Sequence, residues 1–106
     1  MLQTVITIFW IHFVADFVLQ SQWMGVNKSK NSWILGLHCL IYSLPFLYFG
    51  IYYAVINGMM HFIVDFITSR CTSKLYAKKK YHWFFVVIGF DQAVHMTLLV
   101  VTLRFI

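Results

Sequence analysis

Histidine and aspartate side chains recur four residues apart in three apolar stretches of the chain. They form three pairs: His12 with Asp16, His61 with Asp65, and, in the reverse order, Asp91 with His95. The sequence contains 3 acidic residues in all, so every one of them belongs to such a pair. Residues four apart lie on one face of a helix, one turn above the other. Imidazole and carboxylate groups on a shared face are suitable ligands for Zn²⁺, Mn²⁺ or iron.

The composition predicts an integral membrane protein. The chain is 61% hydrophobic and 10% charged, whereas a soluble domain carries about 25% charged residues. A surface with so few charges would not keep a monomer dissolved in water. Residues 1–18 lack a basic region and a small-residue cleavage site, so we expect a retained helix rather than a signal peptide. The length predicts one integral membrane domain that covers residues 1–106.

Four apolar segments are long enough to cross a bilayer. We expect spans at about residues 2–20, 33–49, 51–69 and 82–103. At about 1.5 Å per residue the first segment covers about 28 Å, close to the roughly 30 Å hydrocarbon core. Pro45, the only proline, is expected to kink the second span. The sequence therefore predicts an all-α fold, a four-helix transmembrane bundle. The alternative is a buried or re-entrant hairpin formed by the second and third segments.

Basic residues are concentrated in two of the connections between these segments. Seven of the 8 Lys and Arg residues lie in loops 21–32 and 70–81, which are on the same side if all four segments span. Cytoplasmic loops carry an excess of Lys and Arg, so we expect these loops in the cytoplasm and both termini outside. This distribution is typical of membrane topology rather than of a nucleic-acid groove, so no nucleic-acid partner is expected.

The paired residues and one further histidine, His38, are predicted to lie at similar depths. Counted from the cytoplasmic ends of the spans, all seven fall between about 7 Å and about 20 Å into the membrane. A charged aspartate at the centre of a span costs about 2.5 to 3.5 kcal/mol, so we expect the carboxylates to face the bundle interior. Two further polar residues, Gln20 and Asn57, extend the same helix faces and are expected to orient ligands or substrate.

Three interpretations of this polar layer are open from the sequence. The first is a metal site, in which three aspartates balance two divalent cations and one hydroxide. The expected ligands are His12, Asp16, His61, Asp65, Asp91 and His95. His38 and Asp65 are the expected catalytic residues, with His38 as a ligand or a general base. The other two interpretations are a hydrogen-bonded network that only joins the helices and a path for protons or cations.

The first and third segments contain nearly the same string of residues. His12–Phe17 and His61–Phe66 are offset by 49 residues, from position 12 to position 61. Both segments run in the same direction, so we predict a parallel pseudo-repeat of two helical hairpins. His38 and the Asp91–His95 pair do not superpose at this offset, so the second helices of the two halves are expected to differ.

Taken together, these strings resemble a known family, the small bacterial and phage membrane proteins grouped as domain of unknown function 3307. The resemblance is carried by His12–Gln20, by Leu37 and His38 with Tyr42, by Asn57 with His61, Phe62 and Asp65, by Ser69 and Arg70, and by Asp91, Gln92 and His95. It covers nearly the whole chain, implies a multi-pass protein of the bacterial inner membrane, and brings no established activity. A weaker likeness to membrane-bound metal-dependent hydrolases is an analogy, because fold alone does not determine function.

The sequence therefore predicts a small multi-pass membrane protein with an intramembrane His/Asp metal site near the cytoplasmic face. The expected cofactor is a divalent metal, Zn, Mn or Fe, and the hypothesis for activity is hydrolysis of a lipid-linked or phosphate ester. The run Lys78–Lys80 is expected to contact anionic lipid, and a bundle this small is expected to form a homo-oligomer. The alternative is a non-enzymatic membrane protein, either an ion or proton conductor or a holin-like structural component.

Overall fold

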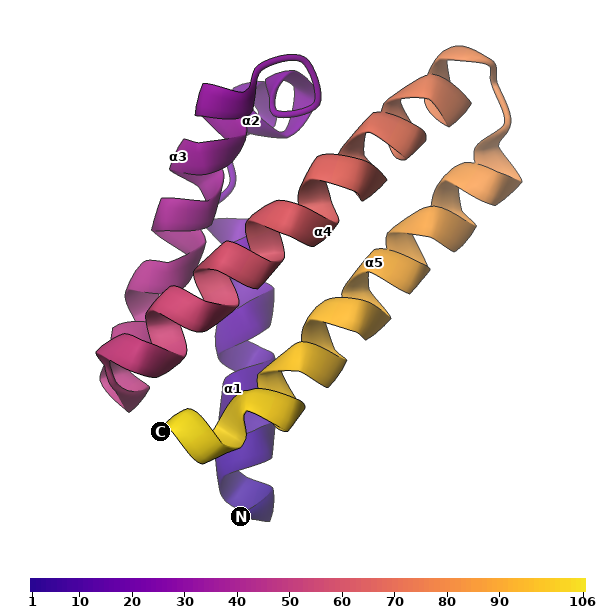
Figure 1. The fold of residues 1–106 in the computed structure, drawn as a ribbon. Helices are drawn as coiled ribbons and strands as arrows, with labels where there is room; N and C mark the ends of the chain where they lie inside the picture. Colours follow the sequence, from indigo (N-terminus) through magenta and orange to yellow (C-terminus); the bar gives the residue numbers. More distant parts are fainter.

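Almost all of the chain is helical, because its apolar stretches contain a single proline and few glycines. The computed structural model describes all residues from Met1 to Ile106, and it contains no strand (Figure 1). Five α-helices and three π or 3₁₀ segments follow one another: α1 (Leu2–Phe13), the π segment η1 (Val14–Val18), α2 (Gln22–Asn27), α3 (Ser32–Ser43), the 3₁₀ segment η2 (Leu44–Phe49), α4 (Ile51–Ala77), α5 (Tyr81–Val101) and the 3₁₀ segment η3 (Thr102–Phe105). The predicted all-α fold is confirmed.

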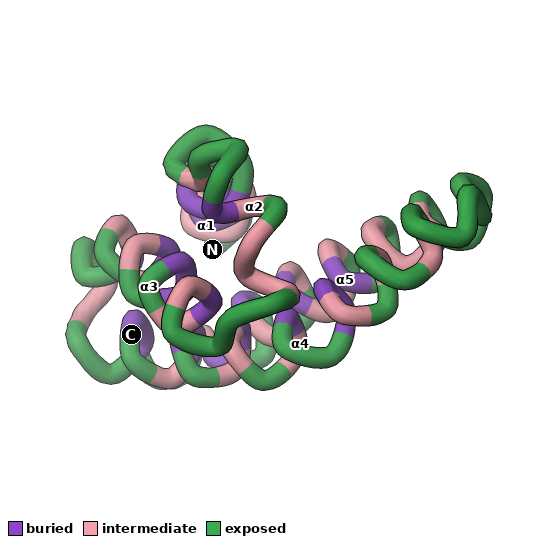
Figure 2. Tube along the Cα trace, turned by 90° about the horizontal axis from the view of Figure 1, so that it is seen from above, coloured by how far each residue is buried: buried purple, intermediate pink, exposed green.

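α4 and α5 form an antiparallel hairpin, and the other helices pack around it (Figure 1). α3 lies along the N-terminal part of α4, and the two helices diverge toward the end where α2 sits beside α3 (Figure 1). Seen from above, α3, α4 and α5 form a row, and α1 lies against one face of that row (Figure 2). Both termini lie at the end opposite α2 (Figure 1). Side chains from α1, η1, α3, α4 and α5 can therefore meet between α1 and the row.

Three helical segments are long and apolar enough to cross a membrane. They are Ser32–Phe49, Ile51–Ala77 and Tyr81–Phe105. The first predicted span, 2–20, is a shorter apolar helix that ends at Val18. Length and hydropathy thus support three of the four predicted spans, and the shorter helix packs against them. The pseudo-repeat of two hairpins and the side of the membrane on which each loop lies stay predictions.

The first basic connection, expected to be a loop, contains a short helix, α2. α2 begins after Ser21, whose side chain accepts a hydrogen bond from the backbone N–H of Met24 at 3.1 Å. The helix has six residues, which is too short for an apolar repeat to show in the sequence. Lys28 is the C-cap residue of α2, so the position of this helix determines where the lysine lies.

The second basic connection, predicted over residues 70–81, is helical as far as Ala77. The turn between α4 and α5 is therefore only Lys78–Lys80. Tyr76 packs on Phe84 with the ring centroids 5.3 Å apart, which joins the two helices beyond their apolar parts. With 27 residues α4 is about 40 Å long and exceeds the roughly 30 Å hydrocarbon core. The basic end of α4 thus extends into the head-group layer if the helix spans.

Pro45 lies where the second span changes its type of helix. α3 ends at Ser43, and the tighter 3₁₀ segment Leu44–Phe49 continues in its place. Proline has no N–H to donate and its ring crowds the preceding turn, so a regular α-helix does not continue through it. The helix thus changes its type at Pro45, and the expected kink stays a prediction.

The interior of the bundle contains many polar groups and its exterior is largely apolar, unlike a soluble protein. Eleven of the 22 buried residues are polar or charged. Large hydrophobic side chains cover the outside; Trp10 and Trp33, for example, are 66% and 88% exposed. An apolar exterior with the polar groups turned inward fits a lipid environment. This arrangement agrees with the predicted membrane class.

An apolar core lies toward the end that holds the termini and the turn at Gly50. Its members are Ile8, Ala15, Tyr42, Phe46, Tyr53, Ala54 and Leu99. The Tyr53 hydroxyl donates to the Leu99 carbonyl at 2.7 Å, and Asn57 Nδ2 donates to Thr102 Oγ1 at 2.9 Å. Asn57, expected to orient ligands or substrate, instead joins α4 to the end of the last span. Its place in the fold is structural.

Gly58 allows α4 to approach α3 closely. A Cβ at this position would lie 3.0 Å from the Cβ of Ser43. Gly58→Ala is therefore expected to force the helices apart and to lower the free energy of unfolding in detergent by about 1 to 3 kcal/mol. The matched control is Gly89→Ala on α5, where a Cβ would meet nothing within 4 Å and alanine should stabilise the helix by up to about 1 kcal/mol. Equal unfolding free energies for the two variants would contradict this close approach.

Candidate metal centre

Asp16, His38 and His61 bring three potential ligand atoms together inside the bundle. His38 Nε2 lies 3.1 Å from Asp16 Oδ1 and 3.1 Å from His61 Nε2, and His61 Nε2 lies 3.4 Å from Asp16 Oδ1. None of the three residues is more than 5% exposed. They come from η1, α3 and α4, so only the tertiary fold brings them into contact.

The spacing of these three atoms fits the coordination of a small divalent cation. Bonds of about 2.0 to 2.1 Å place neighbouring ligands of a tetrahedral ion about 3.3 Å apart. The observed separations are 3.1, 3.1 and 3.4 Å. Hydrogen bonds alone satisfy at most two of the three contacts, because each Nε2 carries at most one proton and two protonated nitrogens would oppose each other. A shared cation satisfies all three contacts at once.

Two further triads overlap the first one. They are His61, Asp65 and His95, and Asp16, Asp91 and His95, and the ligand atoms within each triad lie within 4.8 Å of one another. Asp16, His61 and His95 each belong to two triads, so the three triads form one continuous cluster. Each triad could hold a metal ion, and the triads share ligands with one another. The predicted convergence of the three aspartates is present, and their binding of a metal stays a prediction.

His12, the remaining predicted ligand, lies beside the triads rather than in them. Its Nδ1 is 2.9 Å from the Tyr42 hydroxyl, and its Nε2 is 2.6 Å from Gln92 Oε1. Asp16 Oδ2 lies 3.9 Å from the same Nε2. Because both ring nitrogens are already paired, His12 is placed to position its neighbours. His38 is better placed as a ligand, which is one of the two roles expected for it.

The ring of His61 is held between two other rings. Tyr42 stacks on one face with the centroids 3.9 Å apart, and His95 stacks on the other at 4.0 Å. The Nδ1 atom of His61 is buried and has no hydrogen-bond partner. Stacking therefore sets the orientation of this ring and directs its Nε2 toward Asp16 and His38. Tyr42 had no predicted role, although it lies four residues after His38 and thus on the same helix face.

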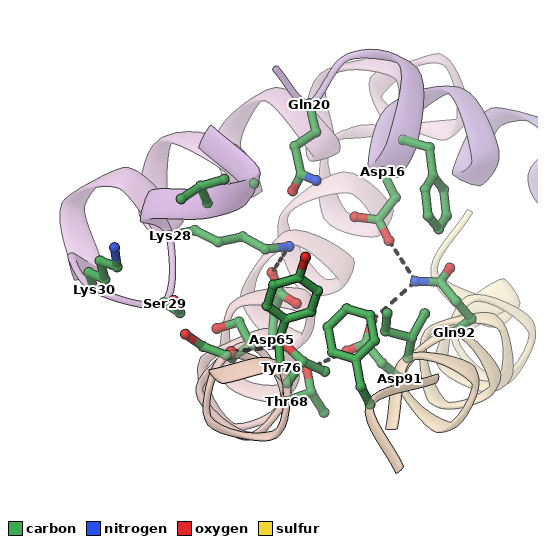
Figure 3. A pocket seen from close by; sticks show the side chains of 18 of the residues that line it. Asp16, Gln20, Lys28, Ser29, Lys30, Asp65, Thr68, Tyr76, Asp91 and Gln92 are labelled. Carbon is green, nitrogen blue, oxygen red and sulfur yellow. Dashed lines mark hydrogen bonds and ion pairs between the residues drawn. The ribbon is translucent and has the colours of Figure 1, made fainter. Parts of the chain in front are cut away.

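Gln92, for which no role was predicted, connects two of the carboxylates. Its Nε2 donates to Asp16 Oδ2 at 3.0 Å and to Asp91 Oδ2 at 3.1 Å (Figure 3). Its Oε1 lies 2.6 Å from His12 Nε2. A polar residue next to an aspartate in an apolar span was an available signal. Gln92 holds Asp16 and Asp91 in a defined relative position, with their other oxygens free to face histidines.

Lys28 contacts the cluster from the end of α2. Its Nζ lies 2.8 Å from Asp65 Oδ2, and the lysine side chain is only 14% exposed (Figure 3). From the sequence, this residue was expected only to mark membrane topology, because the contact depends on how α2 folds over the bundle. Asp65 therefore has a cationic partner within the protein, and a divalent ion bound to this oxygen would have to displace it.

A π-helical turn positions Asp16. Residues Val14–Val18 are π-helical, and the Leu19 N–H bonds to the Val14 carbonyl at 2.9 Å, five residues back. Such turns are rare and occur often at functional sites, because the extra residue rotates the side chains that follow. The corresponding stretch around Asp65 in α4 is a regular α-helix. The two nearly identical strings thus present their aspartates in different ways.

A pocket of about 610 Å³ connects the cluster with the surface on the side of α2 (Figure 3). Its lining includes all three aspartates together with Gln92. Phe17, Phe84 and Ile88 contribute apolar surface, and Lys28 and Lys30 contribute positive charge. Gln20, expected to orient ligands or substrate, also lines the pocket (Figure 3). Asp65 therefore faces the pocket, whereas His38 is 1% exposed and does not line it.

The fold and the cluster define a class of protein: a helical protein with several candidate membrane spans and buried His/Asp triads able to hold a metal ion. Residues 4–106 match the family described as protein of unknown function DUF3307, and the chain belongs to this family. The resemblance predicted from the strings of residues is confirmed. No curated protein and no solved structure matches the chain significantly, so the likeness to metal-dependent hydrolases stays an expectation.

Proposed function

We propose that the protein is a metal-dependent hydrolase of the membrane, with its site open to the cytoplasmic side, that acts on a lipid-linked or phosphate ester. The observation that carries this proposal is the set of overlapping triads whose three aspartates line an amphiphilic pocket. A divalent ion held there would act as a Lewis acid and would lower the pKa of a bound water toward about 7. Zn, Mn and Fe all accept this combination of imidazole and carboxylate ligands.

The positions of His38 and Asp65 support different roles for them. His38 is buried and its Nε2 belongs to the triad with the shortest separations, so we assign it as a ligand. Asp65 lines the pocket, and its Oδ2 lies 3.8 Å from His38 Nε2. A carboxylate at this position can accept a proton from a water or a substrate group in the pocket. Asp65 is thus the proposed general base, in addition to its place in the triad with His61 and His95.

The direction in which the pocket opens supports a cytoplasmic site. Its rim is formed near Lys28 and Lys30, within the first of the two basic loops. By the positive-inside rule this side of the bundle lies in the cytoplasm. Lysines at the rim would attract anionic lipid or the head group of a lipid-linked substrate. A homo-oligomer is compatible with the large apolar exterior, which packs equally well against lipid or against a second copy.

The main alternative, an ion or proton conductor, requires a polar path through the whole bundle. Hydrogen bonds do link His12, Gln92, Asp16 and His38 in a chain. Beyond Tyr42, however, buried apolar side chains such as Ile8 and Phe46, which are 1% and 0% exposed, interrupt this chain. A polar cluster that opens on one side only favours a binding or catalytic site over a conduction path. We therefore expect liposomes that contain the protein to show no proton or Na⁺ flux above empty liposomes.

Metal content is the direct test of the proposal. Detergent-purified protein is expected to contain Zn, Mn or Fe in near-stoichiometric amount by elemental analysis, and to lose it to a chelator with a fall in thermal stability, because metal binding contributes to the free energy of folding. His82→Ala, which removes an exposed histidine outside the cluster, is the matched control and should retain the metal. Protein that takes up none of these metals, even when each is supplied in excess, would rule out the proposed function.

A further inference from the structure

The pocket contains two polar atoms whose capacity for hydrogen bonding is unused. Ser69 Oγ on α4 and Gln20 Oε1 after η1 are both buried and have no partner in the protein. Both residues line the pocket, and Ser69 as a whole is only 6% exposed. Buried polar groups are almost always paired, and an unpaired one is costly. Two such atoms in the lining of one pocket therefore indicate a polar ligand.

The chemistry of these atoms restricts the ligand. The amide oxygen of Gln20 can only accept a hydrogen bond, so the ligand must present a donor such as a hydroxyl group. The Ser69 hydroxyl can donate to an anionic oxygen, and Lys28 and Lys30 line the same pocket. Thr72 and Ser73 add two more hydroxyl groups about one turn further along α4. The pocket thus matches a phosphate that is joined to a hydroxyl-bearing group.

The apolar part of the pocket indicates where the ligand comes from. Phe17 in η1 and Phe84 and Ile88 in α5 line it beside the polar atoms. A head group bound at Ser69 would therefore have room for the first part of a hydrocarbon chain. We propose that this pocket binds a membrane amphiphile whose head group carries a phosphate and a free hydroxyl, as a glycerol phosphate or a sugar phosphate does. The proposal rests on the proposed function and narrows its class of substrate.

The charges in the pocket couple this ligand to the metal. Three carboxylates against the two lysines leave one net negative charge, which opposes a phosphate. One divalent cation in the cluster reverses the sign of that charge. The phosphate head group should therefore bind with higher affinity to the metal-loaded protein than to the chelated protein. A purely apolar ligand would show no such difference.

The test measures binding of three probes by calorimetry to detergent-purified protein loaded with Zn²⁺. Dihexanoyl phosphatidylglycerol has the phosphate and the hydroxyl donors, whereas dihexanoyl phosphatidylcholine lacks a donor. We expect phosphatidylglycerol to bind about tenfold more tightly than phosphatidylcholine, and chelation of the Zn²⁺ to weaken its binding by a similar factor. Glycerol 3-phosphate, which has no acyl chain, should bind more weakly than phosphatidylglycerol. Equal affinity for glycerol 3-phosphate would identify a soluble phosphate as the ligand and overturn the assignment to a membrane amphiphile.

Two substitutions locate the binding site. Ser69→Ala and Gln20→Met should each reduce the preference for phosphatidylglycerol over phosphatidylcholine by about fivefold or more, without removing bound Zn²⁺. Thr97→Val, an exposed hydroxyl on α5, and Lys74→Gln, an exposed lysine outside the pocket, are the controls and should leave the preference unchanged.

The outcomes separate the two proposals. Protein that binds Zn²⁺ but does not distinguish the two lipids would overturn the head-group site and leave the metal site intact. The same holds if Ser69→Ala and Gln20→Met both retain the full preference. Protein that binds none of Zn, Mn and Fe but shows a lipid preference sensitive to Ser69→Ala would retain the head-group site and rule out the proposed function.

Discussion

Asp16→Asn is expected to lower the affinity of the protein for a divalent cation by more than about a hundredfold. Asp16 belongs to two of the three triads and supplies the only carboxylate among the three closest atoms. Loss of an outer partner of a metal ligand costs roughly 10- to 100-fold in affinity, and loss of a charged ligand shared by two sites should cost more. Titration of the chelated protein with Zn²⁺ or Co²⁺ in detergent measures the change.

The same variant separates a metal site from a network that only joins the helices. Asparagine keeps the shape of aspartate and can still accept a hydrogen bond from His38, so the fold should be retained. Asp65→Asn is the comparison, since Asp65 belongs to one triad only and its loss should leave binding at the first triad. If Asp16→Asn and wild-type protein bound the metal equally, Asp16 would be part of a structural network. A structural network would also be identified if Asp16→Asn and Asp65→Asn lowered the free energy of unfolding equally and the wild-type protein bound no metal.

Lys28→Gln is expected to act in the opposite direction and to raise the affinity for a divalent cation by about tenfold. The lysine ammonium lies 2.8 Å from Asp65 Oδ2, and both groups are largely buried. A divalent ion bound to that carboxylate must displace the ammonium and tolerate its charge nearby. Two like charges a few ångströms apart repel by several kcal/mol at an effective dielectric constant of about 20, and movement of the lysine relieves part of this. A tenfold change corresponds to about 1.4 kcal/mol.

Lys30→Gln provides the matched control for this prediction. Lys30 lies in the same connection and lines the same pocket, but it forms no ion pair with the cluster. Its loss should change metal affinity by less than about threefold, because an exposed charge is largely screened. If Lys28→Gln bound the metal no better than Lys30→Gln did, Lys28 would serve the fold or the substrate instead of competing with the metal. Weaker metal binding in Lys28→Gln would contradict the competition directly.

A single sequence shows well which residues share one helix face. The spacing of His61 and Asp65 and of Asp91 and His95 identified residues that are buried and gathered in one cluster. That inference works because the helical period is a local property, and because a charged group cannot face lipid cheaply. The apolar pattern also predicted the all-α fold and three segments that are long and apolar enough to cross a membrane. The connection predicted at 70–81 was too long, since α4 is helical as far as Ala77. Basic residues do not end a helix that leaves the membrane.

What the sequence by itself determined is the all-α class of the protein and the seven histidines and aspartates that lie buried inside it. Only the tertiary structure decided which of them meet. His12 and His61 occupy the same place in nearly the same string, yet His61 joins two triads and His12 pairs with Tyr42 and Gln92. The π turn at Asp16 and the path of α2, which brings Lys28 to Asp65, are equally invisible in the sequence. The physical reason is that periodicity sets the face of a helix, whereas contacts between helices depend on their rotation and packing, which many distant residues set together.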